Sequence, residues 1–97
     1  MKDSNKPILD IGTGRGSIPI FLSSKGYYVI SVDMDWSILA EVQDKAVLQD
    51  VHKRLKLVTA NSELLPFADG TFNTVVCINL LHHLQDYEPT LSEMRRV

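Results

Sequence analysis

Three glycines at alternate positions, Gly12, Gly14 and Gly16, separate a short apolar run from a segment with helical spacing. The apolar run, Ile8–Ile11, is typical of a strand buried on both faces, and the segment 17–25 repeats its apolar residues as a helix does. Glycines between a strand and a helix let the backbone turn sharply and approach a ligand, with the first helical N–H groups pointing into the same space. We therefore expect a binding loop here, and a tight turn that binds nothing is the alternative.

The rest of the chain alternates between strand patterns and helix patterns. We expect strands at 8–11, 28–32, 55–59 and 72–78, helices at 17–25, 36–51 and 86–97, and a loop at 61–71. Gly26 is expected to end the first helix, Ser37 to cap the second, and Lys56 to place its strand near a sheet edge. This order predicts an α/β domain over residues 1–97, with a parallel sheet and, through right-handed crossovers, helices on both faces.

Composition limits the classes of function. A chain of 97 residues with 44% apolar and 23% charged residues is typical of one small globular domain. It has no apolar run of about 20 residues and no apolar core of a signal peptide, so we expect a cytoplasmic protein with no membrane partner. A net charge of −2 argues against nucleic acid. The single Cys77 lies in an apolar run and is expected to pack in the core.

An acidic residue follows the second predicted strand. Asp33 would lie beside the glycine loop, because the carboxyl ends of neighbouring parallel strands meet at one edge, and a carboxylate there can accept hydrogen bonds from a ribose diol. The loop and Asp33 together predict a nucleoside site. The G-x-G-x-G spacing differs from the G-x-G-x-x-G of dinucleotide-binding proteins, and no Gly-Lys-Ser/Thr follows, which excludes a Walker loop.

Three ordered segments carry a family resemblance. Asp10-Ile11-Gly12-Thr13-Gly14-Arg15-Gly16 resembles motif I of the class I S-adenosylmethionine-dependent methyltransferases. The run from Ala60 to Asn73 and the run His82-His83-Leu84 resemble segments of the type 11 branch, which lies near the ubiquinone and menaquinone methyltransferases. The resemblance extends from about Ile8 to the end of the chain.

The resemblance implies S-adenosylmethionine as cofactor and a role for each matching residue. Asp10 would orient the loop and help to hold the cofactor's amino group, and the loop backbone at Gly12 and Gly14 would meet the methionine part. Asp33 would bind the ribose hydroxyls, and Met34 would pack on the adenine unless it only packs at the strand end. The other implied cofactor-binding residues are Thr13 and Gly16 in the loop, Asn61 and Ser62 beside the base, and Asn79 and Leu80 after the last strand.

Asn61 stands where the family commonly has an aspartate. Its amide oxygen can still accept a hydrogen bond from the adenine amine.

The remaining polar and aromatic residues have simpler interpretations. His82 and His83 could act as a base or bind a metal, but no cysteine or carboxylate cluster completes a ligand set. We expect His52 and the pair 95–96, two arginines, to be solvated at the surface. Trp36 is expected to pack rather than to stack on a ligand.

The chain also departs from the family. Class I methyltransferases resemble one another in a seven-stranded sheet of order 3-2-1-4-5-7-6, and only strands in the order 3-2-1-4 are expected here, so the domain would be truncated. Residues 74–78 would then form an edge strand with no charge or proline, where we expect two copies to pair or to exchange elements.

Three functions remain open. The first is a methyltransferase acting on a small-molecule acceptor, for which no catalytic base can be named. The second is a cofactor-binding module without turnover. The third, a nicotinamide-dependent oxidoreductase, is disfavoured by the glycine spacing.

Overall fold

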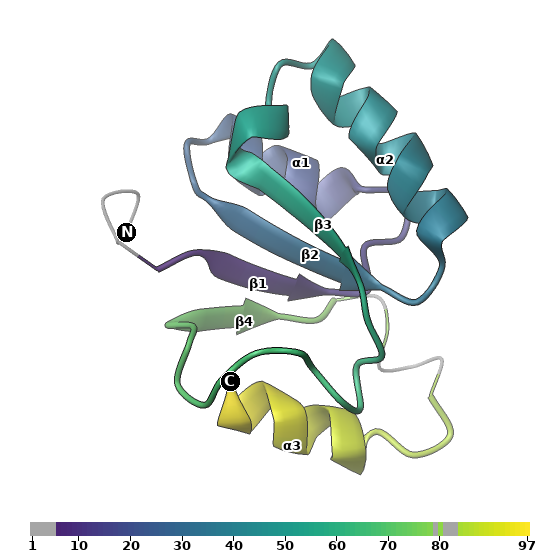
Figure 1. Ribbon diagram of the computed structural model, residues 1–97, viewed down its shortest axis with the longest axis vertical. Helices are drawn as coiled ribbons and strands as arrows, with labels where there is room; N and C mark the ends of the chain where they lie inside the picture. The colour runs from purple at the N-terminus through teal and green to yellow at the C-terminus, as the bar shows by residue number, and fades with distance from the viewer. Residues whose placement is uncertain (1–5, 79, 81–83) are drawn as a thin grey trace.

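The computed structural model describes residues 6–78, 80 and 84–97 and contains one parallel sheet. The strand order is β3-β2-β1-β4, and the four arrowheads in Figure 1 point the same way. This confirms the predicted parallel sheet and its order. The strands are β1 (Ile8–Ile11), β2 (Val29–Asp33), β3 (Leu55–Thr59) and β4 (Thr74–Val76).

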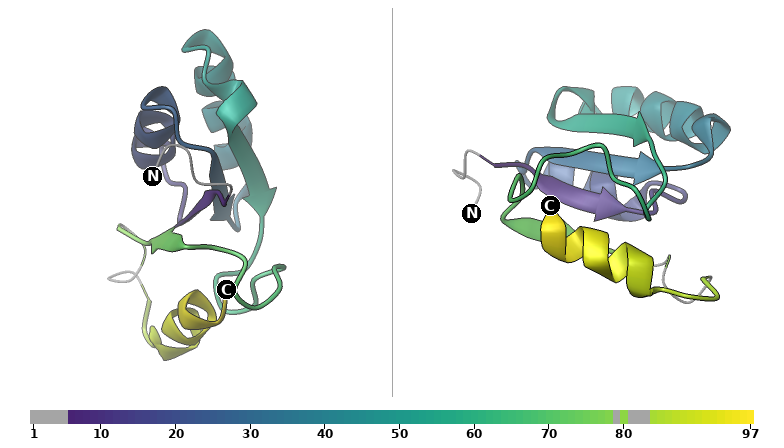
Figure 2. Two further views of the ribbon diagram at one scale, coloured as in Figure 1. Left: turned by 90° about the vertical axis from the view of Figure 1, so that its left-hand side faces the viewer. Right: turned by 60° about the horizontal axis from the view of Figure 1, so that its bottom comes forward.

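Helices cover both faces of the sheet, as predicted. The helices are α1 (Ser17–Ser24), α2 (Trp36–Leu48) and α3 (Glu88–Arg96), with a short 3-10 turn at His52–Arg54 before β3. The right-hand view of Figure 2 shows α3 and the segment before β4 in front of the sheet, with α1 and α2 behind it.

Two apolar clusters correspond to these two faces. The cluster on the α3 side has Leu9, Ile11, Val32, Leu65, Phe72 and Val97 as its buried members. The cluster on the side of α1 and α2 contains Ile20, Val29, Val42, Ala46, Val51 and Leu55. Strand β2 contributes to both clusters, with Val32 on the α3 side and Val29 on the other, whereas β1 contributes Leu9 and Ile11 to the α3 side only, because successive side chains point to opposite faces.

Strand β4 is shorter than the predicted 72–78. The backbone N–H of Phe72 donates to the carbonyl of Val97 at 2.8 Å, so this part of the chain pairs with the end of α3 and not with β1. The Phe72 ring packs edge-on against Phe67, with 5.1 Å between ring centroids. A tertiary contact with the last helix thus overrides the local strand pattern.

The second helix also differs from its prediction. Asp35, not Ser37, caps α2, because its Oδ1 accepts from the Ser37 N–H at 3.0 Å. The helix ends at Leu48 and not at residue 51, and Asp50 then adopts a φ of 56°. Gly26, at a φ of 95°, follows α1 as predicted.

The structure contradicts the predicted burial of two side chains, Trp36 and His52. Trp36 does not pack, since 71% of it is exposed at the start of α2. His52, in the 3-10 turn, is half-buried rather than solvated, and its Nδ1 is inaccessible.

The prediction that Arg96 is solvated at the surface is wrong. Its guanidinium donates to both carboxylate oxygens of Glu93, to Asp69 Oδ1, and to the carbonyls of Leu65 and Phe67, over 2.6–3.0 Å. These bonds hold the pKa of Glu93 down at about 2 and raise the pKa of Arg96 above its usual range. The arginine therefore fastens the segment before β4 to α3.

Candidate functional site

The glycine loop lies against the carboxyl end of β2. The N–H groups of Gly12 and Thr13 both donate to the carbonyl of Val32, at 2.9 and 3.1 Å. The Gly14 N–H donates to Asp33 Oδ2 at 3.3 Å. Backbone and side chain of one strand end therefore hold three successive loop residues in place.

Asp33 keeps acceptor capacity for a ligand. Its Oδ1 accepts from the Asp35 N–H at 3.0 Å and its Oδ2 from Gly14, so each oxygen has one donor where a carboxylate oxygen can take two. The side chain is half-buried and lines a cavity. The predicted meeting of Asp33 with the glycine loop is thus observed.

The cavity at Asp33 brings together residues that are distant in sequence. It has a volume of about 150 Å³, and it lies between the ends of β1 and β2 and the segment that follows β3. Among the predicted site residues, its lining includes Gly12, Asp33, Met34, Asn61, Ser62 and Leu80.

The segment after β3 presents one usable acceptor. Asn61 Oδ1 accepts from the Glu63 N–H at 2.9 Å, which leaves one lone pair of this oxygen for a ligand. The hydroxyl of Ser62 is buried and lies 2.9 Å from that of Thr90 on α3. Ser62 therefore ties the cavity wall to α3. Sequence reasoning missed Thr90, because nothing in the sequence pairs these two positions.

A second cavity lies on the other side of Gly12. It has a volume of about 190 Å³ and is lined by Asp10, Gly12, Thr13, Arg15, Ser17, Ile18 and Ile78. Because Gly12 lines both cavities, the predicted site residues form two adjoining compartments, one at Asp33 and one at Asp10.

Asp10 is buried in a polar cluster. Its Oδ2 accepts from the hydroxyl of Ser31 at 2.6 Å, and that hydroxyl lies 2.7 Å from the hydroxyl of Thr13. Burial raises the pKa of Asp10 to about 6; the hydrogen bond from Ser31 opposes this rise, and the charge of Asp33 adds to it. Sequence reasoning missed Ser31. The only available signal was a serine inside an apolar strand; its register with Asp10 across the parallel pair comes from the structure.

The glycines of the loop differ in what they require. A Cβ on Gly16 would lie 2.8 Å from Val42 Cγ1, so Gly16 allows α1 to begin close against α2. A Cβ on Gly12 would lie 3.0 Å from Leu80 Cβ, and for Gly14 the nearest atom is 4.0 Å away. The structure therefore gives Gly16 a packing role, while Gly12 lines both cavities and Gly14 lines neither but donates its N–H to Asp33.

Three residues with predicted or possible site roles, Asn79, His82 and His83, lie outside the described residues. Within the described part of the chain, no group of three potential metal ligands comes together, and no helix is long and apolar enough to cross a membrane.

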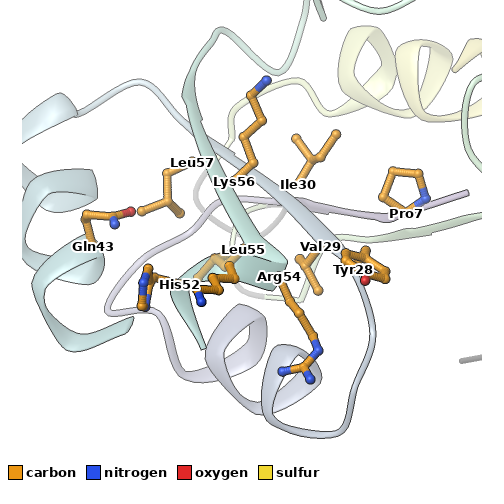
Figure 3. Close-up of a pocket in the computed structure, with 11 residues that line it drawn as sticks. Pro7, Tyr28, Val29, Ile30, Gln43, His52, Arg54, Leu55, Lys56 and Leu57 are labelled. Atoms are coloured by element: carbon orange, nitrogen blue, oxygen red, sulfur yellow. The ribbon is translucent and has the colours of Figure 1, made fainter. Parts of the chain in front are cut away.

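A larger hollow of about 680 Å³ lies away from this site, at the amino end of β3. It contains His52, Lys53, Arg54 and Lys56, but Figure 3 shows Lys56 and Arg54 pointing in opposite directions. Because Lys56 and Arg54 point apart, their charges do not converge on one point of this hollow. We therefore place the candidate site at the carboxyl ends of the strands, where ligands bind in open α/β sheets.

Comparison with known sequences identifies the domain. Residues 9–97 match the family model described as "Methyltransferase domain". The ubiquinone/menaquinone biosynthesis C-methyltransferase UbiE of Marinomonas sp. (strain MWYL1) is 35% identical over 93% of this chain and 37% of its own length. The demethylmenaquinone methyltransferase of Thermus thermophilus is 31% identical over 100% of this chain and 44% of its own. The chain thus spans less than half the length of these relatives.

Solved structures share the fold. The YcgJ protein from Bacillus subtilis superposes with a TM-score of 0.85 at 28% identity, over 95% of this chain and 39% of that one. The geranyl diphosphate C-methyltransferase from Streptomyces coelicolor A3(2), in complex with S-adenosyl-L-homocysteine, gives 0.84 at 18% identity, over 95% and 35%. The family match and the sheet order agree: the chain belongs to the methyltransferase domain family, as its resemblance to the class I S-adenosylmethionine-dependent enzymes predicted.

Proposed function

We propose that this chain binds S-adenosylmethionine in the two compartments that meet at Gly12, and that it supplies the donor-binding part of a methyltransferase. The observation that carries this proposal is the pairing of Asp33 and Asn61 in one compartment with Asp10 in the other. The cofactor has matching parts, with a nucleoside at one end and an amino acid at the other.

The compartment at Asp33 suits the adenosine part. The free acceptor positions of Asp33 would take hydrogen bonds from the ribose hydroxyls, and the remaining lone pair of Asn61 Oδ1 would accept from the adenine amine. Met34 lines the same cavity with 68% of its surface exposed, so it has an apolar side chain available to cover the base.

The compartment at Asp10 suits the amino acid part. The Asp10 carboxylate complements an ammonium group, and Gly12 and Thr13 bring backbone close to the same space. The cofactor, when bound, supplies an electrophilic methyl group on a sulfonium. The residues of this chain bind and orient it, which is catalysis by positioning.

The acceptor is proposed to be a small molecule. The names of the curated relatives support a quinone-type ring methylated at carbon, and this is the first acceptor class to test. The chain matches only 37–44% of those relatives. A second candidate is a module that binds the cofactor and does not turn over, because the two compartments described here account for cofactor binding alone.

The decisive experiment compares ligands. Isothermal titration of the 97-residue chain should show binding of S-adenosylhomocysteine and none of NAD. Binding of NAD alone would contradict the proposal and restore the oxidoreductase interpretation. Methyl transfer to a demethylated quinone, assayed with radiolabelled S-adenosylmethionine, separates the enzyme from the binding module.

We also propose that two copies associate along β4. This strand lies at one edge of the described sheet and carries no charge, whereas β3 at the other edge carries the exposed Lys56. Sedimentation at micromolar concentrations should show a dimer. Thr74→Lys should weaken it and Thr59→Lys, on the β3 edge, should not; a monomer throughout would contradict this proposal.

A further inference from the structure

Three buried polar side chains form one continuous hydrogen-bonded chain beneath the glycine loop. Asp10 on β1 is 2% exposed, Ser31 on β2 is 0% exposed and Thr13 in the loop is 4% exposed. Asp10 and Ser31 are partners in the parallel register of β1 and β2, so the backbone itself places them side by side. Buried polar groups of this kind act as a unit, because each one depends on its neighbour for a partner.

The direction of the hydrogen bonds follows from counting protons. The hydroxyl of Ser31 has one proton, and it donates this proton to Asp10 Oδ2 at 2.6 Å. The Thr13 hydroxyl, 2.7 Å away, must then be the donor to Ser31. The hydrogen bonds therefore run from Thr13 in the loop to Ser31 on β2, and from Ser31 to the carboxylate of Asp10.

We propose that Ser31 and Thr13 are positioning residues, which hold the Asp10 carboxylate ready to receive a ligand's ammonium group, so that binding of this group expels a proton from Asp10. This inference rests on the proposed function, because it assumes that the amino acid part of the cofactor occupies the compartment at Asp10. Beyond that function, it assigns positioning roles to Ser31 and Thr13 and the release of one proton from Asp10 on binding.

The like charge of Asp33 on β2 favours the protonated form of Asp10, so Asp10 has a proton to release when a cation binds. The exposed Arg15 lines the same cavity, and its positive charge favours the ionised form instead. The described residues of α1 and of the β4 side that line this cavity are Ser17, Ile18 and Ile78, which carry no charge. With the pKa of Asp10 raised to about 6, roughly half of the protein holds this proton at pH 6, and a nearby cation favours its loss.

The linkage between ligand binding and proton release from Asp10 is measured by titrating the full chain with S-adenosylhomocysteine between pH 5 and pH 8. Each pH is run in two buffers of different ionisation enthalpy, so that released protons can be counted. We expect affinity to rise about tenfold from pH 5 to pH 7.5, with proton release near pH 6 and none at pH 8. 5′-Methylthioadenosine, which lacks the ammonium and carboxylate groups, should show neither effect.

Variants separate positioning from general packing. Ser31→Ala removes the donor that favours the charged carboxylate, so the rise in affinity should move to higher pH. Asp10→Asn should make the affinity for S-adenosylhomocysteine independent of pH over this range. Ser23→Ala is the matched control, since Ser23 is equally buried on α1 and its hydroxyl has no hydrogen-bond partner among the described residues.

The outcomes are distinct once circular dichroism shows that each variant is folded. Binding of S-adenosylhomocysteine without proton release at pH 6 overturns this inference and leaves the proposed function standing. An unchanged pH profile in Ser31→Ala also overturns it, because Ser31 would then be only a packing residue. Failure of both ligands to bind at any pH overturns the proposed function and this inference with it.

Discussion

The backbone N–H of Gly14 donates to the carboxylate of Asp33 at 3.3 Å, which joins the glycine loop to the end of β2. The same carboxylate accepts from the Asp35 N–H, at the start of α2. Asp33 therefore organises two backbone segments, lines the cavity, and has a further acceptor position on each carboxylate oxygen.

Asp33→Ala should weaken the binding of S-adenosylhomocysteine by about 10- to 100-fold, because charged hydrogen bonds to the ribose would be lost. Asp33→Asn should be intermediate, since it keeps one acceptor oxygen. Asp44→Ala, at an exposed position of α2, is the control. Calorimetry that returns the same affinity for Asp33→Ala and Asp44→Ala would contradict the ribose assignment.

Gly16→Ala should destabilise the fold more than Gly70→Ala. Both glycines have positive φ, 88° and 68°, so both substitutions carry a conformational cost of about 1–2 kcal/mol. Only at Gly16 would the new Cβ meet a neighbour, Val42 at 2.8 Å, and overpacking adds about 1–3 kcal/mol. Urea unfolding of both variants measures the difference; equal losses would show that α1 and α2 can separate without cost.

The architecture was predictable because it depends on local periodicity and on chain order. Strand and helix patterns alternate, and β1, α1, β2 and β3 lie within a residue or two of their predicted bounds. The prediction failed where a distant segment intervened. Phe72 lies in a strand-like sequence, but its N–H donates to the carbonyl of Val97, directly after the last helix, and a local sequence pattern cannot predict that contact.

The candidate site was predictable only at its motif positions. Gly12, Asp33 and Asn61 follow from loop chemistry and family resemblance, and they do line one cavity. Ser31 and Thr90 were missed because their roles arise from side-chain partners on other elements. Such pairings depend on sheet register and helix placement, which a single sequence does not reveal.

Arg96→Lys should lower the melting temperature, and Arg95→Lys should not. The guanidinium of Arg96 reaches Glu93, Asp69 and two carbonyls at once, and a lysine ammonium cannot match this planar fork. Arg95 is exposed and serves as the neighbouring control. Thermal melting followed by circular dichroism tests this; equal melting temperatures for the two variants would show that the segment before β4 is held by its apolar residues alone.

The buried Asp10 should make the folded state less stable as pH rises from about 4 to about 7. The pKa of the Asp10 carboxyl is 3.8 in the unfolded chain and about 6 in the folded chain, so in this pH window the folded state binds more protons than the unfolded state. This pKa difference corresponds to about 3 kcal/mol of folding stability, which is present below pH 4 and lost above pH 6. The pair of Glu93 and Arg96 acts in the opposite direction only below about pH 4.5, where the Glu93 carboxylate begins to be protonated in the unfolded chain.

Asp10→Asn should therefore flatten the dependence of the unfolding free energy on pH between 4 and 7, because the amide does not titrate. Asp44→Asn, which changes an exposed carboxylate, should retain the wild-type slope. Urea unfolding at pH 4, 5, 6 and 7 gives the three curves. A wild-type slope that persists in Asp10→Asn would mean that another group carries the linkage, and that Asp10 is ionised at the same pH in the folded and unfolded chains.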